Sequence, residues 1–180
     1  MSKAKFLPAP VTGVALTIVL IVNTLFFGAP VIVFCLAKLL MRLVHLKAAE
    51  GYCTIGVMWV AQTWMKVNLF FVRLFIDIDW DIQIEPELSE QRSYLITCNH
   101  QSWVDILALY QTTMNETSFL RFFIKDQLKY IPILGLAWWG LDFPFMKRHS
   151  KELLAKRPEL KGKDLETTRL ACDRFRGRPV

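Results

Sequence analysis

The side chains best suited to chemistry are Asn99, His100 and Asp105, which stand together in the stretch NHQSWVD. A neutral imidazole can take a proton from an alcohol near pH 7 and return it to a leaving group. A carboxylate on the following turn can hold the second ring nitrogen, which is the base-and-orienter half of a serine-hydrolase triad. The spacing therefore predicts that His100 acts as a general base and that Asp105 orients it.

Two other interpretations of these residues stay open. Asn99 can be a turn residue, and Asp105 can be an acidic residue at the start of a helix. Ser102 is the only nearby hydroxyl and lies outside any GxSxG motif, so a nucleophile carried by the protein is disfavoured. A substrate hydroxyl activated by His100 would take that role.

The elements around these residues predict an α/β fold with a partial, mixed, partly parallel sheet. Strands alternate with helices along the chain, and this alternation is typical of parallel sheets. The last helix should carry Leu165, Cys172 and Phe175 on one face, and Gly177 should end it. The expected elements are a half-exposed strand over 76–84, a buried strand over 94–98, a helix over 102–112, a strand over 119–124, a loop and short helix over 130–140, a strand over 143–146 and a helix over 164–176.

The N-terminal part predicts membrane-embedded or interfacial helices. From Phe6 to Ala37 there is no charged residue, which is long enough to enter a bilayer and too long for a signal peptide. Gly28-Ala29-Pro30 should kink or break this run, giving one kinked, tilted span or a short hairpin in one leaflet. The charges and tryptophans of residues 51–75 favour an interfacial helix, with a core helix of the next domain as the alternative. The positive residues after the first run predict that the C-terminal part is cytoplasmic.

Charge and cysteine usage limit the partners. The whole net charge of +6 lies in residues 147–180, which suits anionic lipid or a phosphorylated substrate. A nucleic-acid partner is disfavoured because no groove-reading motif accompanies the apolar N-terminus. The four cysteines show no CxxC spacing, so neither a metal site nor a disulfide framework is expected. Trp138 and Trp139 are candidate contacts for lipid or an acyl chain.

The NHQSWVD stretch resembles the NHx4D motif of the glycerolipid acyltransferases, the lysophosphatidic acid acyltransferase (PlsC-like) family. The stretches FIKDQLKYIPILGLAWWGLDFPFMKR and KGKDLETTRLACDRF resemble bacterial inner-membrane members of that family. The resemblance implies transfer of a fatty acyl group from acyl-CoA or acyl-carrier protein to a lysophospholipid hydroxyl. It implies that His100 is the base and Asp105 its partner, and that no cofactor or metal is needed.

The same resemblance assigns the substrate-binding residues. Lys125 and Arg148 match the family positions that bind the substrate phosphate, and Asn99 and Lys147 stand beside the motif residues as further candidates. Arginine suits phosphate because its planar guanidinium makes paired hydrogen bonds. The alternatives are a surface lysine beside Asp126 for Lys125 and membership of the basic tail for Arg148.

The family continues with a strand, an EGTR-type motif and a fourth, proline-containing motif, and none of these follows here. We therefore expect residues 1–75 to form a membrane anchor with interfacial helices, and residues 76–180 to form the N-terminal part of an incomplete acyltransferase domain. Two other functions stay open at this stage. One is a non-catalytic membrane-binding protein, and the other is a lipid acyl hydrolase that uses the same histidine and aspartate.

Overall fold

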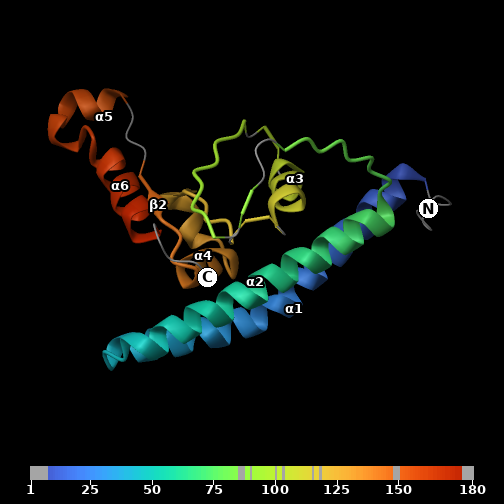
Figure 1. Ribbon diagram of the computed structural model, residues 1–180, viewed down its shortest axis with the longest axis horizontal. Helices are drawn as coiled ribbons and strands as arrows, with labels where there is room; N and C mark the ends of the chain where they lie inside the picture. The colour runs from blue at the N-terminus through green and yellow to red at the C-terminus, as the bar shows by residue number, and fades with distance from the viewer. Residues whose placement is uncertain are drawn as a thin grey trace.

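The computed structural model describes residues 8–84, 88–89, 91–99, 101–102, 104–114, 116–117, 119–147 and 151–175. This part of the chain is mostly helical, with one small parallel sheet beside a long helical hairpin (Figure 1). The elements are α1 (Ala9–Leu43), α2 (Lys47–Phe75), α3 (Val104–Thr113), β1 (Ile124–Lys125), η1 (Asp126–Tyr130), α4 (Leu134–Gly140), β2 (Phe145–Met146), α5 (Lys151–Lys156), η2 (Pro158–Leu160) and α6 (Lys163–Phe175).

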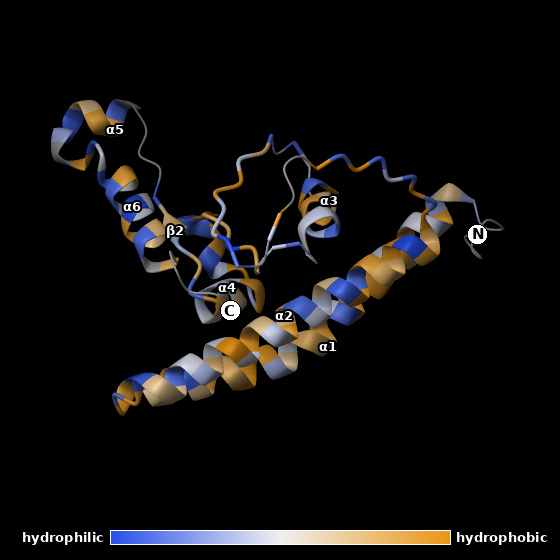
Figure 2. Cartoon of the chain, viewed as in Figure 1, coloured by the Kyte–Doolittle hydropathy of each residue, from blue (hydrophilic) through white to orange (hydrophobic). Residues whose placement is uncertain are grey.

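Helices α1 and α2 form an antiparallel hairpin that is the longest part of the molecule (Figure 1). At 1.5 Å per residue they extend about 52 Å and about 44 Å. A short turn joins them, with His45 in the left-handed conformation at φ 59°. Helix α1 is strongly apolar, whereas α2 mixes apolar and hydrophilic residues (Figure 2), and both are long and apolar enough to cross a membrane. That criterion concerns length and composition alone, and the core helix of a soluble protein also meets it.

Of the kink or break expected at Gly28-Ala29-Pro30, the break is wrong, because α1 runs through Pro30 as one helix. A proline inside a helix removes one hydrogen bond and costs about 3 kcal/mol. Here α1 packs along its length against α2, and this lateral packing offsets that cost. Gly28 adds a close contact, since a Cβ at that position would lie 3.0 Å from Ile133 Cγ2. The hairpin therefore forms between α1 and α2 and not within α1.

A polar network joins the two helices of the hairpin. Asn23 Nδ2 donates to Asn68 Oδ1 at 2.7 Å, and both side chains are buried. Trp64, one turn before Asn68 on α2, donates from Nε1 to Oγ1 of Thr24, the residue after Asn23, at 3.3 Å. Polar side chains between apolar helices form hydrogen bonds across the interface and fix the register of the pair.

The strands expected over 76–84 and 94–98 are not formed. The described residues of both segments run as extended chain away from the end of α2, without ladder partners (Figure 1). Leu95 is 74% exposed and Cys98 is exposed, whereas the sequence predicted a buried strand here. A strand satisfies its backbone only by pairing with another strand, and no described segment pairs with either of these two.

The sheet of the described residues consists of β1 and β2, which are parallel and shorter than the strands expected over 119–124 and 143–146. Ile124 pairs with Phe145, and Lys125 pairs with Met146. Helices η1 and α4 form the connection between the strands, as a βαβ crossover requires. The α/β prediction therefore holds for this unit, and a larger mixed sheet is absent from the described residues.

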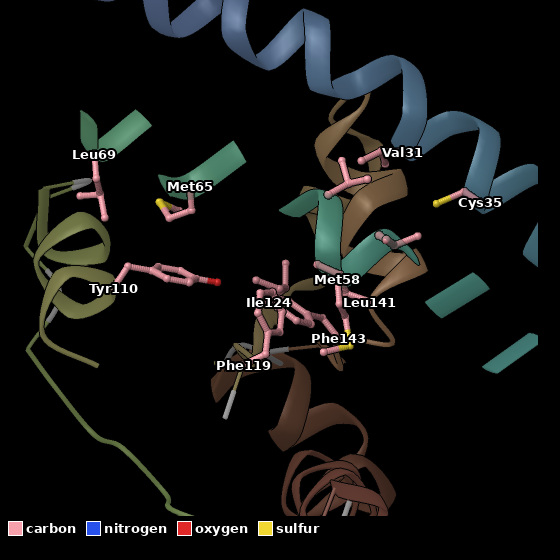
Figure 3. Packing of buried hydrophobic residues seen from close by; sticks show 12 residues of the cluster. Val31, Cys35, Met58, Met65, Leu69, Tyr110, Phe119, Ile124, Leu141 and Phe143 are labelled. Carbon is pink, nitrogen blue, oxygen red and sulfur yellow. The ribbon is translucent and has the colours of Figure 1, made fainter. Parts of the chain in front are cut away.

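The hydrophobic core lies where the hairpin meets the β1–α4–β2 unit. Val31 and Cys35 of α1, Met58 of α2, and Leu141 and Phe143 are buried together (Figure 3). A second part of the same cluster places Tyr110 of α3 against Met65 and Leu69 of α2 (Figure 3). The hairpin is therefore packed into the same core as the following elements.

The expected helices over 102–112 and 164–176 are confirmed as α3 and α6. The face of α6 that carries Leu165 and Cys172 is not its buried face, since Leu165 is 72% exposed and Cys172 is exposed. Ala171 is buried instead, and Phe175 lies half-buried. The choice of face is a tertiary effect: α6 packs against β2, and Arg121 lies over the ring of Phe175.

Candidate functional site

The first turn of α3 holds Asp105 in a fixed position. Its Oδ2 accepts hydrogen bonds from the backbone N–H groups of Gln101 at 2.6 Å and Ser102 at 2.8 Å. The Ser102 hydroxyl accepts from the N–H of Val104 at 3.2 Å and donates to Asp105 Oδ1 at 3.4 Å. This arrangement is a variant of the capping box: Asp105 accepts from the N–H of Ser102, three positions before it, while the Ser102 hydroxyl accepts from the N–H of Val104.

The capping box confirms that Asp105 is an acidic residue at a helix start, and it is compatible with a second role as the partner of His100. Asp105 does act as an acidic residue at a helix start, as one interpretation held. A carboxylate has about four acceptor positions, so these bonds leave capacity for an imidazole N–H. His100 lies outside the described residues. Asn99 lies directly before it, exposed at the end of the extended segment.

Ser102 is engaged in capping. Its hydroxyl oxygen is committed to the N–H of Val104 and its proton is directed to Asp105. A serine nucleophile needs its proton directed to a base and its oxygen directed to the substrate. The geometry therefore agrees with the sequence in disfavouring Ser102 as a nucleophile.

Lys125 and Lys147 lie at the same end of the small sheet. Lys125 ends β1, and Lys147 follows Met146, the residue that pairs with Lys125. Both side chains are exposed, and neither has an ion pair or a side-chain hydrogen bond with any described residue. The carboxyl ends of parallel strands are where ligands bind in α/β folds, so two unpaired cations there suit an anionic ligand.

Asp126, the neighbour that could have neutralised Lys125, is bound elsewhere. Its carboxylate accepts hydrogen bonds from Lys129 Nζ at 2.9 and 3.0 Å. The hydrogen bond to Asp126 raises the pKa of Lys129. Asp126 therefore pairs with Lys129 and not with Lys125.

Asn99 does not belong to the sheet of β1 and β2. The segment over 94–98 forms no ladder with β1, so Asn99 is not carried to the end of that sheet. Lys125 and Lys147 share one end of the small sheet. Asp105 is fixed separately at the start of α3. Arg148, like His100, lies outside the described residues.

Sequence reasoning missed Lys38. It counted this lysine as a flanking charge of the membrane run, whereas its side chain is 1% exposed and contacts Gly140 and Asp142. A signal was present in the sequence, because Lys38 follows Val31 and Cys35 at the spacing of one helix face. A charge in register with the buried face predicts a buried partner.

A groove of about 310 Å³ lies between the end of α1, the turn after α4, and α6. Trp139, Phe145 and Phe175 supply aromatic surface to it, and Arg42 and Asp142 supply charge. Trp138 and Trp139 are both half-buried, and both pack against the core. No three His, Cys, Asp or Glu side chains gather as a metal site within the described residues.

Residues 81–169 match the family model Acyltransferase. The match contains Asn99, His100, Asp105, Lys125, Lys147 and Arg148. It supports the assignment of this part of the chain to the acyltransferase family, and with it acyl transfer as the general activity. No curated protein and no solved structure matches the chain.

Proposed function

We propose that this protein is a membrane-bound acyltransferase of the lysophosphatidic acid acyltransferase type, related to the bacterial inner-membrane acyltransferase YihG. It would transfer a fatty acyl group from acyl-CoA or acyl-carrier protein to a lysophospholipid hydroxyl in phospholipid synthesis or remodelling. The observation that carries the proposal is the family match over residues 81–169, which spans every candidate site residue.

The reaction follows from the roles of His100 and Asp105. The imidazole of His100 removes the proton of the acceptor hydroxyl, and the hydroxyl oxygen attacks the thioester carbonyl carbon. The carbon–sulfur bond then breaks, and the leaving thiolate takes the proton from the imidazolium. Asp105 orients the imidazole and stabilises its charged form. The capping box supports this role because it holds the carboxylate in one position.

The phosphate of the acceptor is held by the cations after β1 and β2. Lys125 and Lys147 provide two exposed ammonium groups at one end of the sheet. Arg148 adds a guanidinium, which makes paired hydrogen bonds to phosphate oxygens. Asn99 precedes the histidine and contributes an amide to the same substrate.

The hairpin positions this site at a membrane surface, with the catalytic part on the cytoplasmic side. The core and α3 contact α2 from Val57 to Arg73, over about 24 Å of its length. A hairpin crossing a hydrocarbon region of about 30 Å would draw these elements into the lipid. We therefore place the hairpin along the surface, with its exposed apolar residues, such as Val22, Phe26 and Leu36, entering one leaflet.

The experiment is acyl transfer by a His100→Ala variant of the protein expressed from its own gene. An acyl thioester and lysophosphatidate are supplied in vesicles, and the diacyl product is measured by mass spectrometry. Loss of the base should lower turnover by at least about a hundredfold. Binding to the vesicles should be unchanged, because the hairpin is intact.

His45→Asn is the matched control. His45 lies exposed in the hairpin turn at φ 59°, a conformation that asparagine also adopts. Turnover by this control should equal the wild-type value. Equal turnover by His100→Ala would refute the mechanism, free fatty acid as product would indicate a hydrolase, and vesicle binding without turnover would indicate a non-catalytic protein.

A further inference from the structure

Lys38 is a buried cation between the hairpin and the rest of the protein. Its Nζ donates to the backbone carbonyl of Gly140 at 2.8 Å and lies 2.9 Å from Asp142 Oδ1. The same ammonium lies 5.4 Å from the ring centroid of Trp139. All three contacts are with the end of α4 and the turn after it, so one side chain of α1 binds this turn through three groups.

A lysine in this position is costly to keep. Removing an ammonium group from water carries a penalty of several kcal/mol unless a paired charge and hydrogen bonds compensate for it. An apolar residue would continue the buried face of Val31 and Cys35 without that penalty. The ion pair with Asp142 and the hydrogen bond to Gly140 compensate for the lost hydration of Lys38. Asp142 is thereby held in place, because its displacement would leave the buried ammonium without its paired charge.

Asp142 occupies a constrained turn. Its φ of 59° lies in the left-handed region, which aspartate and asparagine adopt more readily than most residues. The N–H of Asp142 donates to the carbonyl of Trp139 at 3.0 Å, and the N–H of Phe143 donates to that of Trp138 at 2.9 Å. The turn is therefore fixed by its own backbone on one side and by Lys38 on the other.

This turn leads directly into β2. Phe143 is buried, the carbonyl of Pro144 accepts from the N–H of Ile124 at 3.0 Å, and Phe145 and Met146 pair with β1. Lys147 follows at once. Whatever fixes Asp142 also fixes where Lys147 stands relative to Lys125, since only four residues separate Asp142 from Lys147.

We propose that Lys38 is a positioning residue for phosphate binding: its contacts with Asp142 and Gly140 fix the turn before β2 and so align Lys147 with Lys125. This inference rests on the proposed function, because it gives those two lysines a phosphate to bind. Its structural part, the dependence of β2 on Lys38, stands on the contacts alone and can be measured without turnover.

The first test is hydrogen–deuterium exchange of the whole protein in vesicles, comparing wild type with Lys38→Met, Asp142→Asn and Lys66→Met. Lys38→Met removes the ammonium and keeps an unbranched apolar chain. Asp142→Asn keeps the backbone conformation and one oxygen acceptor, so it keeps the fold if Lys38→Met does not. Lys66→Met is the matched control, since Lys66 is exposed on α2 and has no interaction with described residues.

Exchange in the peptide covering residues 141–147, and at the amide of Ile124, should accelerate about tenfold in Lys38→Met and less in Asp142→Asn. Lys66→Met should match wild type. If exchange of this peptide stays at the wild-type rate in every folded variant of Lys38 and Asp142, the proposal is overturned. If Lys38→Met does not fold, Asp142→Asn alone tests the proposal. Exchange of residues 141–147 at the wild-type rate in Asp142→Asn would then overturn it.

The second test separates positioning from loss of folded enzyme. A smaller folded fraction lowers the maximal rate and leaves KM unchanged, whereas misplaced phosphate contacts raise KM for the acceptor. Lys38→Met should raise KM for lysophosphatidate about tenfold, given that a misplacement of about 1 Å can cost about a hundredfold. An unchanged KM would overturn the link to phosphate. Absence of turnover in wild type would instead refute the proposed function and leave the exchange result to judge the structural part.

Discussion

Apolar runs in the sequence predicted the helices that form the hairpin and the strands of the extended segment (residues 76–84 and 94–98), and only the helices formed as predicted. Helices α1 and α2 run for 35 and 29 residues with their backbones paired internally. The extended segment alternates apolar and polar residues over 76–84 as a strand does, yet its described residues have no ladder. The difference lies in where each element finds its hydrogen bonds.

A helix satisfies its backbone within its own sequence, so a sustained apolar run is almost enough to specify it. A strand needs a second strand in register, and the rest of the chain must supply it. The hairpin also gains from specific contacts between its helices, such as the Asn23–Asn68 hydrogen bond. Substitutions should therefore be felt strongly in the hairpin and weakly in the extended segment.

The largest effect should come from filling the closest approach in the hairpin. A Cβ at Gly56 would lie 2.5 Å from the ring of Phe34, so Gly56→Val forces the two helices apart. Overpacking of this kind costs about 1–3 kcal/mol of the free energy of unfolding. Denaturant unfolding of the protein in detergent micelles measures the loss.

The control is Gly51→Ala, in the same helix. No atom lies within 4 Å of a Cβ at Gly51, and alanine favours helix over glycine. This variant should gain about 0.5–1 kcal/mol of unfolding free energy. Equal losses in the two variants would show that the hairpin contact at Gly56 is not specific.

A smaller effect should follow from breaking the polar network. Asn23→Leu leaves the buried amide of Asn68 without its partner, which costs about 1–2 kcal/mol. The double variant Asn23→Leu/Asn68→Leu should recover much of that loss, since both polar groups are then gone. A double-mutant cycle on unfolding free energies gives the coupling. Additive losses would mean that the two amides do not depend on each other.

The smallest effect should come from the extended segment. Leu95 is 74% exposed, so Leu95→Ser should change the unfolding free energy by no more than about 0.5 kcal/mol. A loss above about 2 kcal/mol, as for a buried leucine, would show that this segment is packed as a strand in the working protein. In that case, substitutions in the extended segment and in the hairpin would affect the unfolding free energy to a similar extent.

The candidate site also contains features set by local sequence and features set by tertiary structure. The start of α3 and the capping role of Asp105 were readable from sequence, because a serine followed three residues later by an acidic residue is a local signal. The placement of Lys125 beside Lys147 needed the parallel register of β1 and β2, which no local pattern gives. The roles of His100 and Arg148 stay predictions, since both lie outside the described residues.

The sequence by itself determined the helices α1, α2, α3 and α6, the NHQSWVD motif and the basic C-terminal region, because each depends on residues within a few turns of one another. Only the tertiary structure decided that α1 passes through Pro30, that Ala171 replaces Cys172 on the buried face of α6, and that Lys38 is buried against Asp142. Those outcomes depend on contacts between residues that are far apart in the chain. A lysine that looked like a flanking charge is thereby a link between the hairpin and β2, because the turn after α4 brings a carboxylate and a carbonyl to it.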